Sequence, residues 1–118
     1  MFGPSLKKIG KWGEKGNVSK LEKVLSHSNE EFRNAAFKAL GESGDQEATT
    51  LLTNYIRHPE ATIRRKAALA LGDTGAERTL EFLRKLSRDD EDESVREAAN
   101  EAILKVNAAI EQHENSRK

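Results

Sequence analysis

A thirteen-residue pattern occurs twice at one fixed spacing, and it constrains the fold more than any other feature of the chain. The first copy runs from Phe32 to Gly44, and the second runs from Ile63 to Gly75, thirty-one residues later. Six of the thirteen positions are identical between the two copies. A third, partial copy begins at Val95, one residue beyond the same spacing. Recurrence at such a period is typical of stacked helical repeats.

Each copy has the apolar spacing of one helix face. From Phe32, apolar residues recur at i, i+4, i+7 and i+8, which predicts an amphipathic helix over about residues 30–40. The alanines of each copy are small enough to let neighbouring motif helices pack closely. Glycine readily takes the left-handed conformation that ends many helices, so we expect Gly41 and Gly72 to end the first two motif helices. The third copy has Leu104 at this position, so we expect a longer last helix.

A companion helix precedes each motif helix. Apolar spacing predicts these helices over residues 17–26, 46–57 and 76–86. A short amphipathic piece near the N-terminus aligns with the end of the repeat, and no stretch shows the alternation of a strand. We therefore predict an all-α solenoid of three stacked antiparallel helical hairpins with an N-terminal helical stub. It forms one domain, 1–118, with a cap (1–16), repeats (17–110) and a frayed tail (111–118).

The second motif, Ile-Arg-Arg-Lys-Ala-Ala-Leu-Ala-Leu-Gly-Asp-Thr-Gly from Ile63 to Gly75, resembles the inner-helix signature of HEAT-like repeats, in the short form also seen in phycobilisome lyase subunits. Pro59 matches the loop proline of that family, and the resemblance covers residues 17–110 best. It implies that three motif arginines are structural and bond to neighbouring loops: Arg33, Arg64 and Arg96. Such repeats occur in scaffolds, assembly factors, regulators and a few enzymes, so the resemblance predicts fold better than function.

The histidines are the first candidates for a metal site. His27 and His58 each lie six residues before a motif arginine, and Asp90 is their counterpart in the third copy. Equivalent atoms of stacked units lie about 10 Å apart, whereas zinc bonds are about 2 Å long, so we assign these residues a structural role in loops. His113 and Glu114 resemble the His-Glu pairs of HEAT-repeat metal hydroxylases. Those enzymes need several such pairs, and this chain has one, so we do not assign it to a metal site.

The acidic run from Asp89 to Glu93 suggests calcium at first sight. An EF-hand loop requires glycine at its sixth position and glutamate at its twelfth, where this chain has Ser94 and Asn100. We therefore interpret the run as a solvated loop whose last carboxylates favour the positive end of the next helix. The chain has no cysteine, serine elbow or phosphate loop. We predict no catalytic, cofactor-binding or metal-binding residues, and no enzyme activity.

The net charge is zero but unevenly distributed. Residues 1–40 carry eight Lys/Arg against four Asp/Glu, and residues 87–118 carry five against nine. Six lysines near Trp12 form the basic part: Lys7, Lys8, Lys11, Lys15, Lys20 and Lys23. A neutral chain with an acidic end disfavours nucleic-acid binding, and we assign Trp12 to packing at the end of the stack. Charges on exposed ends are screened beyond about 10 Å, so we expect a monomer or weak self-association.

The chain contains no apolar run of membrane-spanning length and no apolar stretch of a secretory leader near the N-terminus. We therefore expect no membrane association and a cytoplasmic location.

The remaining candidate is the face of the motif helices that points away from their companions. The residues one and five positions after each motif arginine should lie there: Asn34, Lys38, Arg65, Leu69, Glu97 and Glu101. This band changes from basic to acidic along the stack. The sequence therefore favours a non-enzymatic interaction scaffold or assembly module that holds a protein or peptide partner in a groove. An accessory subunit of a lyase or other modifying enzyme, and nucleic-acid binding through the N-terminal lysines, are the alternatives.

Overall fold

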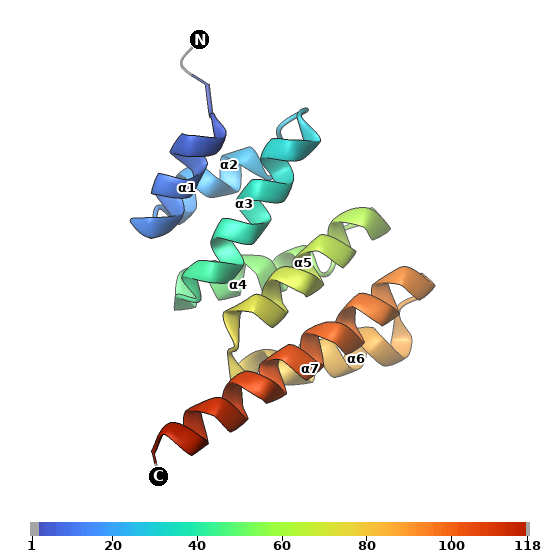
Figure 1. Ribbon diagram of the computed structural model, residues 1–118. Coiled ribbons are helices and arrows are strands. Elements are labelled where there is room, and N and C mark those ends of the chain that lie inside the picture. Colours follow the sequence, from blue (N-terminus) through green and yellow to red (C-terminus); the bar gives the residue numbers. More distant parts are fainter. Residues whose placement is uncertain (1–2, 118) are drawn as a thin grey trace.

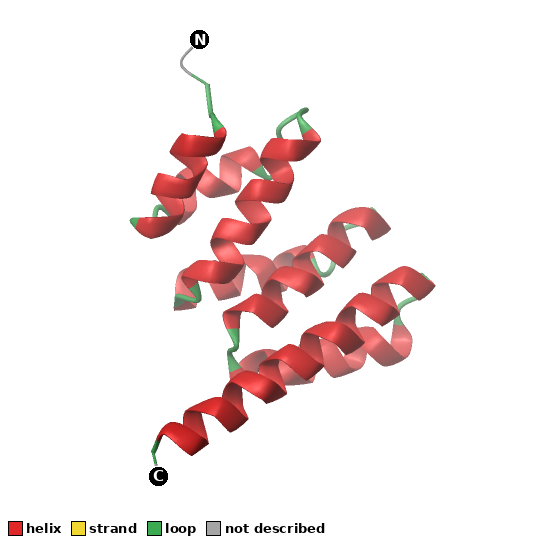
Figure 2. Ribbon diagram, viewed as in Figure 1, coloured by secondary structure: helices red, strands yellow, loops and turns green. Residues whose placement is uncertain are grey.

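The computed structural model describes residues 3–117, which form a stack of helices. The helices are α1 (Leu6–Glu14), α2 (Val18–Val24), α3 (Glu30–Ser43), α4 (Gln46–Tyr55), α5 (Ala61–Thr74), the 3-10 helix η1 (Glu77–Thr79), α6 (Leu80–Asp89) and α7 (Glu93–Ser116). Figure 1 shows α1, α3, α5 and α7 in one layer, with α2, α4 and α6 behind them. No strand occurs in the described part of the chain (Figure 2). The prediction of an all-α solenoid is therefore confirmed.

Three helical hairpins make up the stack, and we call them the first unit (α2 and α3), the second unit (α4 and α5) and the third unit (α6 and α7). The helix α1 packs beside α3 as the expected N-terminal stub (Figure 1). The described chain measures 47 × 39 × 18 Å along its principal axes. The short dimension accommodates two helix layers, so the buried side chains lie between the layers and between successive units.

The motif helices begin at side-chain caps in two of the three units. Asn29 accepts hydrogen bonds from the backbone N–H groups of Glu31 and Phe32 at 2.9 and 3.3 Å. Asp92 does the same for Ser94 and Val95 at 2.8 and 3.2 Å. Such caps satisfy N–H groups that have no partner within the helix. Glu60, before α5, makes no such bond.

The glycines that end the motif helices are not those expected from the sequence. Gly41 and Gly72 lie inside α3 and α5, which continue to Ser43 and Thr74. The left-handed residues that follow the helices are Gly44, with φ 61°, and Gly75, with φ 64°. The prediction that Gly41 and Gly72 end the helices is therefore wrong.

Gly41 and Gly72 serve close packing between motif helices. A Cβ atom on Gly41 would lie 2.7 Å from the carbonyl oxygen of Ala70, and one on Gly72 would lie 2.8 Å from the Cα of Ala102. Neither neighbour is a flexible side chain that can move aside. Ala70 and Ala102 are buried at these contacts, which confirms that the motif alanines lie where motif helices pack together.

The stub α1 packs on α3 in a different register. Gly10 aligns with Gly41 in the repeat, but no atom of a neighbouring helix lies within 4 Å of a Cβ built on it. Instead Gly13, one turn later, makes the close contact, with a Cβ position 2.9 Å from the Cβ of Ala39. The shift leaves the space around Gly10 open.

The last unit differs from the others at both ends. As predicted, α7 is long and extends for 24 residues; Leu104 and Asn107 replace the packing glycine and the terminating glycine of the earlier units. The segment expected as a frayed tail is helical and exposed over 111–116, while residues 1, 2 and 118 of the expected cap and tail lie outside the described part. The companion helix expected over 76–86 begins as η1, where the Thr79 hydroxyl donates to the carbonyl oxygen of Ala76 at 2.7 Å.

Candidate functional site

The motif arginines hold the loops that precede their helices. In each unit the arginine Nη1 donates to a loop carbonyl oxygen, at 2.7 Å from Arg33 to His27, 2.9 Å from Arg64 to His58 and 2.6 Å from Arg96 to Asp90. Buried or half-buried carbonyl groups need such partners, since an unpaired one costs free energy. The structural role implied by the family resemblance is confirmed.

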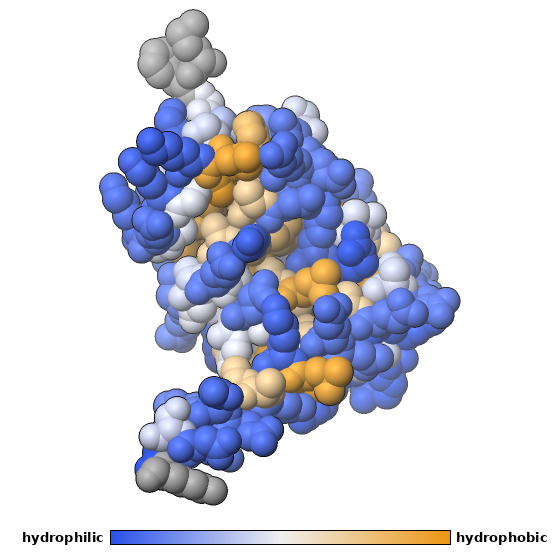
Figure 3. Space-filling view, in the orientation of Figure 1, coloured by the Kyte–Doolittle hydropathy of each residue, from blue (hydrophilic) through white to orange (hydrophobic). Residues whose placement is uncertain are grey.

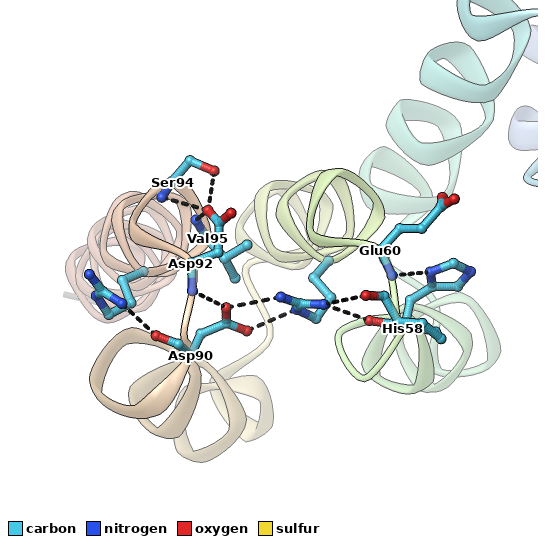
Figure 4. A network of polar contacts seen from close by, with 9 residues as sticks. His58, Glu60, Asp90, Asp92, Ser94 and Val95 are labelled. Atoms are coloured by element: carbon cyan, nitrogen blue, oxygen red, sulfur yellow. Dashed lines mark hydrogen bonds and ion pairs between the residues drawn. The ribbon is translucent and has the colours of Figure 1, made fainter.

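The same side-chain hydrogen bond also occurs in each of these loops, at His27, His58 and Asp90. Each accepts a hydrogen bond from the backbone N–H two residues later: His27 Nδ1 from Asn29 at 3.0 Å, His58 Nδ1 from Glu60 at 3.0 Å, and Asp90 Oδ1 from Asp92 at 2.9 Å. Figure 4 shows the second and third of these loops. The structural role predicted for these residues in loops is confirmed.

Asp90 has a further partner that the sequence analysis missed. Arg64 of the second unit donates to both of its oxygens, with 2.9 Å from Nε to Oδ2 and 3.2 Å from Nη2 to Oδ1 (Figure 4). The two side chains are only 10% and 7% exposed, so the expectation that Asp90 belongs to a solvated loop is wrong. The hydrogen bonding that Arg64 donates to Asp90 is the main cause that raises the pKa of Arg64. Bidentate pairs of this kind are the stronger class of charged hydrogen bond.

The rest of the acidic run has ordinary structural partners. Asp92 caps α7 as predicted, and hydrogen bonds from the Ser94 hydroxyl and then the Val95 backbone lower its pKa. Asp89 pairs with its neighbour Arg88 in an exposed position. Within residues 3–117, no group of three His, Asp or Glu side chains lies close enough together to hold a metal ion.

Two further ion pairs connect neighbouring motif helices. Lys66 of α5 contacts Glu30 of α3 at 3.2 Å, and this hydrogen bond lowers the pKa of Glu30. Lys105 of α7 pairs with Asp73 of α5, which raises the pKa of Lys105. Glu30 and Lys105 are largely exposed, so water and salt screen these pairs more than the pair of Arg64 and Asp90.

The surface of α1, α3, α5 and α7 that faces away from the companion helices is here called the inner face. All six predicted residues are at least partly exposed. Four of them line one hollow of about 280 Å³ between α3 and α5: Asn34, Lys38, Arg65 and Leu69. Glu97 and Glu101 are exposed on α7 outside this hollow. On this side of the molecule, apolar surface lies in separate patches among polar surface (Figure 3).

A second hollow, of about 530 Å³, lies between α1 and α3 and was not predicted. Its lining includes the apolar side chains of Leu6, Ile9 and Ala35 and the backbone of Gly10. Leu6 is 46% exposed, and Lys38 lines this hollow as well as the one between α3 and α5. This hollow includes the open space around Gly10, which results from the register of α1 on α3. The sequence pattern alone does not indicate this register.

The profile of the HEAT repeats matches residues 5–68 and 18–104, which together span most of the chain. The chain belongs to the HEAT-repeat family. No match was found among curated proteins. HEAT repeats are commonly protein-interaction scaffolds and are typically not catalytic.

The basic surface of this HEAT-repeat protein lies on α1 and α2. The six N-terminal lysines are all exposed, and the Lys20 Nζ lies 5.4 Å from the centroid of the Trp12 ring. Trp12 itself packs against the core, as the sequence analysis expected of an end-packing residue. None of the helices within residues 3–117 has the length and apolar character needed to cross a membrane.

Proposed function

We propose that this HEAT-repeat protein is a non-enzymatic interaction scaffold or assembly module that holds a protein or peptide partner on its inner face. One observation carries the proposal: two adjacent hollows lie on that face and have Lys38 in common. A partner segment that crosses α1, α3 and α5 would fill both.

The composition of the two hollows supports a protein partner. Apolar groups such as Leu6 and Leu69 offer surface whose burial stabilises a complex by about 25 cal/mol per Å² before the costs of association. Lys38 and Arg65 line the hollows, and Glu97 and Glu101 lie further along the stack on α7. This distribution favours a partner with acidic groups over α3 and α5 and basic groups over α7, because complementary charges set register and specificity.

Charge reversal tests the proposal directly. The variants Arg65→Glu and Glu97→Lys should each weaken partner binding about tenfold, a loss of roughly 1.4 kcal/mol. The partner is first captured with the wild-type protein from its native cell, and its affinity for each variant is then measured with purified components. Circular dichroism melts should match the wild type, because both side chains are at least partly exposed.

Matched controls lie on the companion helices. Lys23→Glu on α2 and Glu81→Lys on α6 make the same two charge changes at exposed positions away from the inner face. Both should leave the affinity unchanged. Equal affinities of all four variants would contradict the inner face as the binding surface.

A further inference from the structure

The contact between successive units at the loops before the motif helices, here called a joint, occurs twice with different chemistry. At the second joint, between the second and third units, the Arg64 guanidinium binds both oxygens of Asp90 (Figure 4). At the first joint, between the first and second units, Arg33 and His58 occupy the equivalent positions. The repeat therefore provides an internal reference for what a motif arginine binds across a joint.

Arg33 lacks the partner that Arg64 has. Its Nη1 donates to the carbonyl oxygens of His27 and Ser28, as the Arg64 Nη1 does in its own loop. Within residues 3–117, the structure shows no hydrogen bond from its Nε or Nη2, the two atoms that Arg64 directs to Asp90. Arg33 is also partly exposed, whereas Arg64 is buried.

A hollow of about 840 Å³ lies at the first joint. One wall comes from the loop before α3 and the first turn of that helix, including Ser28 and Arg33, and the other comes from the loop before α5, including His58 and Glu60. At the second joint the equivalent place is taken by the buried pair of Arg64 and Asp90.

His58 cannot replace the carboxylate of Asp90. Its Nδ1 accepts the backbone N–H of Glu60, so in the neutral ring the proton lies on Nε2, which then acts as a donor. The ring stacks on Tyr55, with centroids 6.1 Å apart and planes at 15°, which favours this orientation. Arg33 and His58 thus both offer donors to the first joint, and within residues 3–117 no carboxylate is hydrogen-bonded to Arg33.

We infer that the hollow at the first joint binds a side-chain carboxylate of an acidic peptide segment in a partner protein. One carboxylate oxygen would accept a hydrogen bond from Arg33 Nε and the other from Arg33 Nη2. The two oxygens of Asp90 accept from the same atoms of Arg64. Arg33 and Lys66 bring two positive charges to the hollow, Glu60 lines it, and Glu30 is held on Lys66. Because these charges nearly balance, the site suits one carboxylate rather than a highly charged polyanion.

The test uses the full chain and follows the Nε–H signal of Arg33 in ¹H–¹⁵N spectra. The probe is an acetylated and amidated pentapeptide, Ala-Ala-Asp-Ala-Ala, and the matched control replaces its aspartate by asparagine. The aspartate peptide should shift the Arg33 signal with a dissociation constant of roughly millimolar, and the asparagine peptide should not. The Nε–H signal of Arg64 should not shift with either peptide, because this group already donates to Asp90.

Two substitutions at one position separate binding from folding. His58→Asp supplies an internal carboxylate where the second joint has Asp90, so it should abolish the shift and raise the melting temperature. His58→Asn keeps an acceptor for the Glu60 N–H without a charge, so the peptide should still bind. Glu60→Gln removes a competing carboxylate from the hollow and should tighten binding several-fold.

The opposite results would overturn the inference. It fails if the aspartate peptide leaves the Arg33 signal unmoved, if His58→Asp binds the peptide as well as the wild type, or if inorganic phosphate shifts the signal and the peptide does not. The inference does not depend on the inner face, because Arg65→Glu and Glu97→Lys change neither Arg33 nor His58. Failure of one proposal therefore leaves the other standing.

Discussion

The two joints of the stack have the same loop geometry but are held together by different interactions. At both joints a motif arginine binds the carbonyl oxygen of its own loop, and the side chain six residues earlier accepts a backbone N–H. The second joint adds a buried ion pair between Arg64 and Asp90. The first joint has instead the partly exposed pair of Lys66 and Glu30 and an open hollow.

This difference shows that one position in the repeat can serve two purposes. Histidine and aspartate both satisfy the loop through a single acceptor atom. Only aspartate has a second oxygen and a negative charge for the arginine of the preceding unit. The choice at residues 58 and 90 therefore sets whether a joint is closed internally or left with donors facing an open hollow.

The largest expected effect comes from removing the carboxylate of the second joint. Asp90→Ala leaves the buried Arg64 guanidinium without its partner and should lower the free energy of unfolding by about 3 kcal/mol, as measured by urea denaturation. Asp90→Asn keeps one oxygen, which can still accept from the loop N–H and from Arg64 Nη2, so its loss of unfolding free energy should be smaller. A loss below about 1 kcal/mol for Asp90→Ala would mean that the pair does not hold the second joint.

The next effect concerns a contact that recurs between successive units, the close approach of motif helices at a glycine. Gly41→Ala should lower the free energy of unfolding by about 2 kcal/mol, because the new Cβ would lie 2.7 Å from a backbone oxygen. Gly10→Ala is the matched control at the aligned position, where no atom of a neighbouring helix is within 4 Å. It should raise the stability by about 1 kcal/mol through helix propensity. If thermal melts showed the same sign for both variants, close packing would not explain the motif glycine.

The smallest effect concerns the exposed ion pair of the first joint. The hydrogen bond from Lys66 lowers the pKa of Glu30 below its ordinary value of 4.5. A lowered pKa in the folded state contributes stability above the unfolded value, and this contribution is lost as the pH falls below about 4.5. Glu30→Gln should therefore lower the melting temperature slightly at pH 7 and make no difference near pH 2.

High salt is the control for this last comparison. The effect of Glu30→Gln at pH 7 should shrink in 1 M NaCl, since the pair is exposed, whereas the effect of Asp90→Ala should persist. A salt-independent loss for Glu30→Gln would show that the side chain acts through packing instead.

Much of the architecture can be predicted from the sequence because the same local pattern occurs in each unit. The spacing of Phe32, Ala36 and Leu40 sets a buried helix face, and the same spacing thirty-one residues later requires the same environment. The equivalence of His27, His58 and Asp90 likewise predicts their common place in the loops. Repetition supplies several observations of one local structure, which is why these predictions are correct.

The errors arise where one residue type has two physical roles. A motif with glycines three residues apart does not indicate which one takes a positive φ and which one allows close packing. Only the backbone angles assign the end of the helix to Gly44 and the contact with Ala70 to Gly41. The sequence pattern predicts an exposed Asp90 because it does not show the contact with Arg64, which lies in the preceding unit, twenty-six residues away.

The inner-face residues were predictable as a surface but not as a site. Their spacing from the motif arginine correctly places them where water reaches them. The hollow at Leu6 and Gly10 depends on how α1 is shifted against α3, which is a tertiary property with no local signal. What the face holds depends on a second molecule, about which a single sequence contains no direct information.

Leu104 has a consequence for how many such units can join. An additional hairpin, or a second copy of the protein placed end to end, that repeated the contact between α5 and α7 would bring its backbone as near to position 104 as these helices come at Gly72. The leucine, 70% exposed on the outer flank of α7, fills the space that this approach requires. Open helical filaments form when a head-to-tail contact can repeat without limit, and a leucine in place of the packing glycine disfavours repetition of the contact between α5 and α7 beyond the third unit.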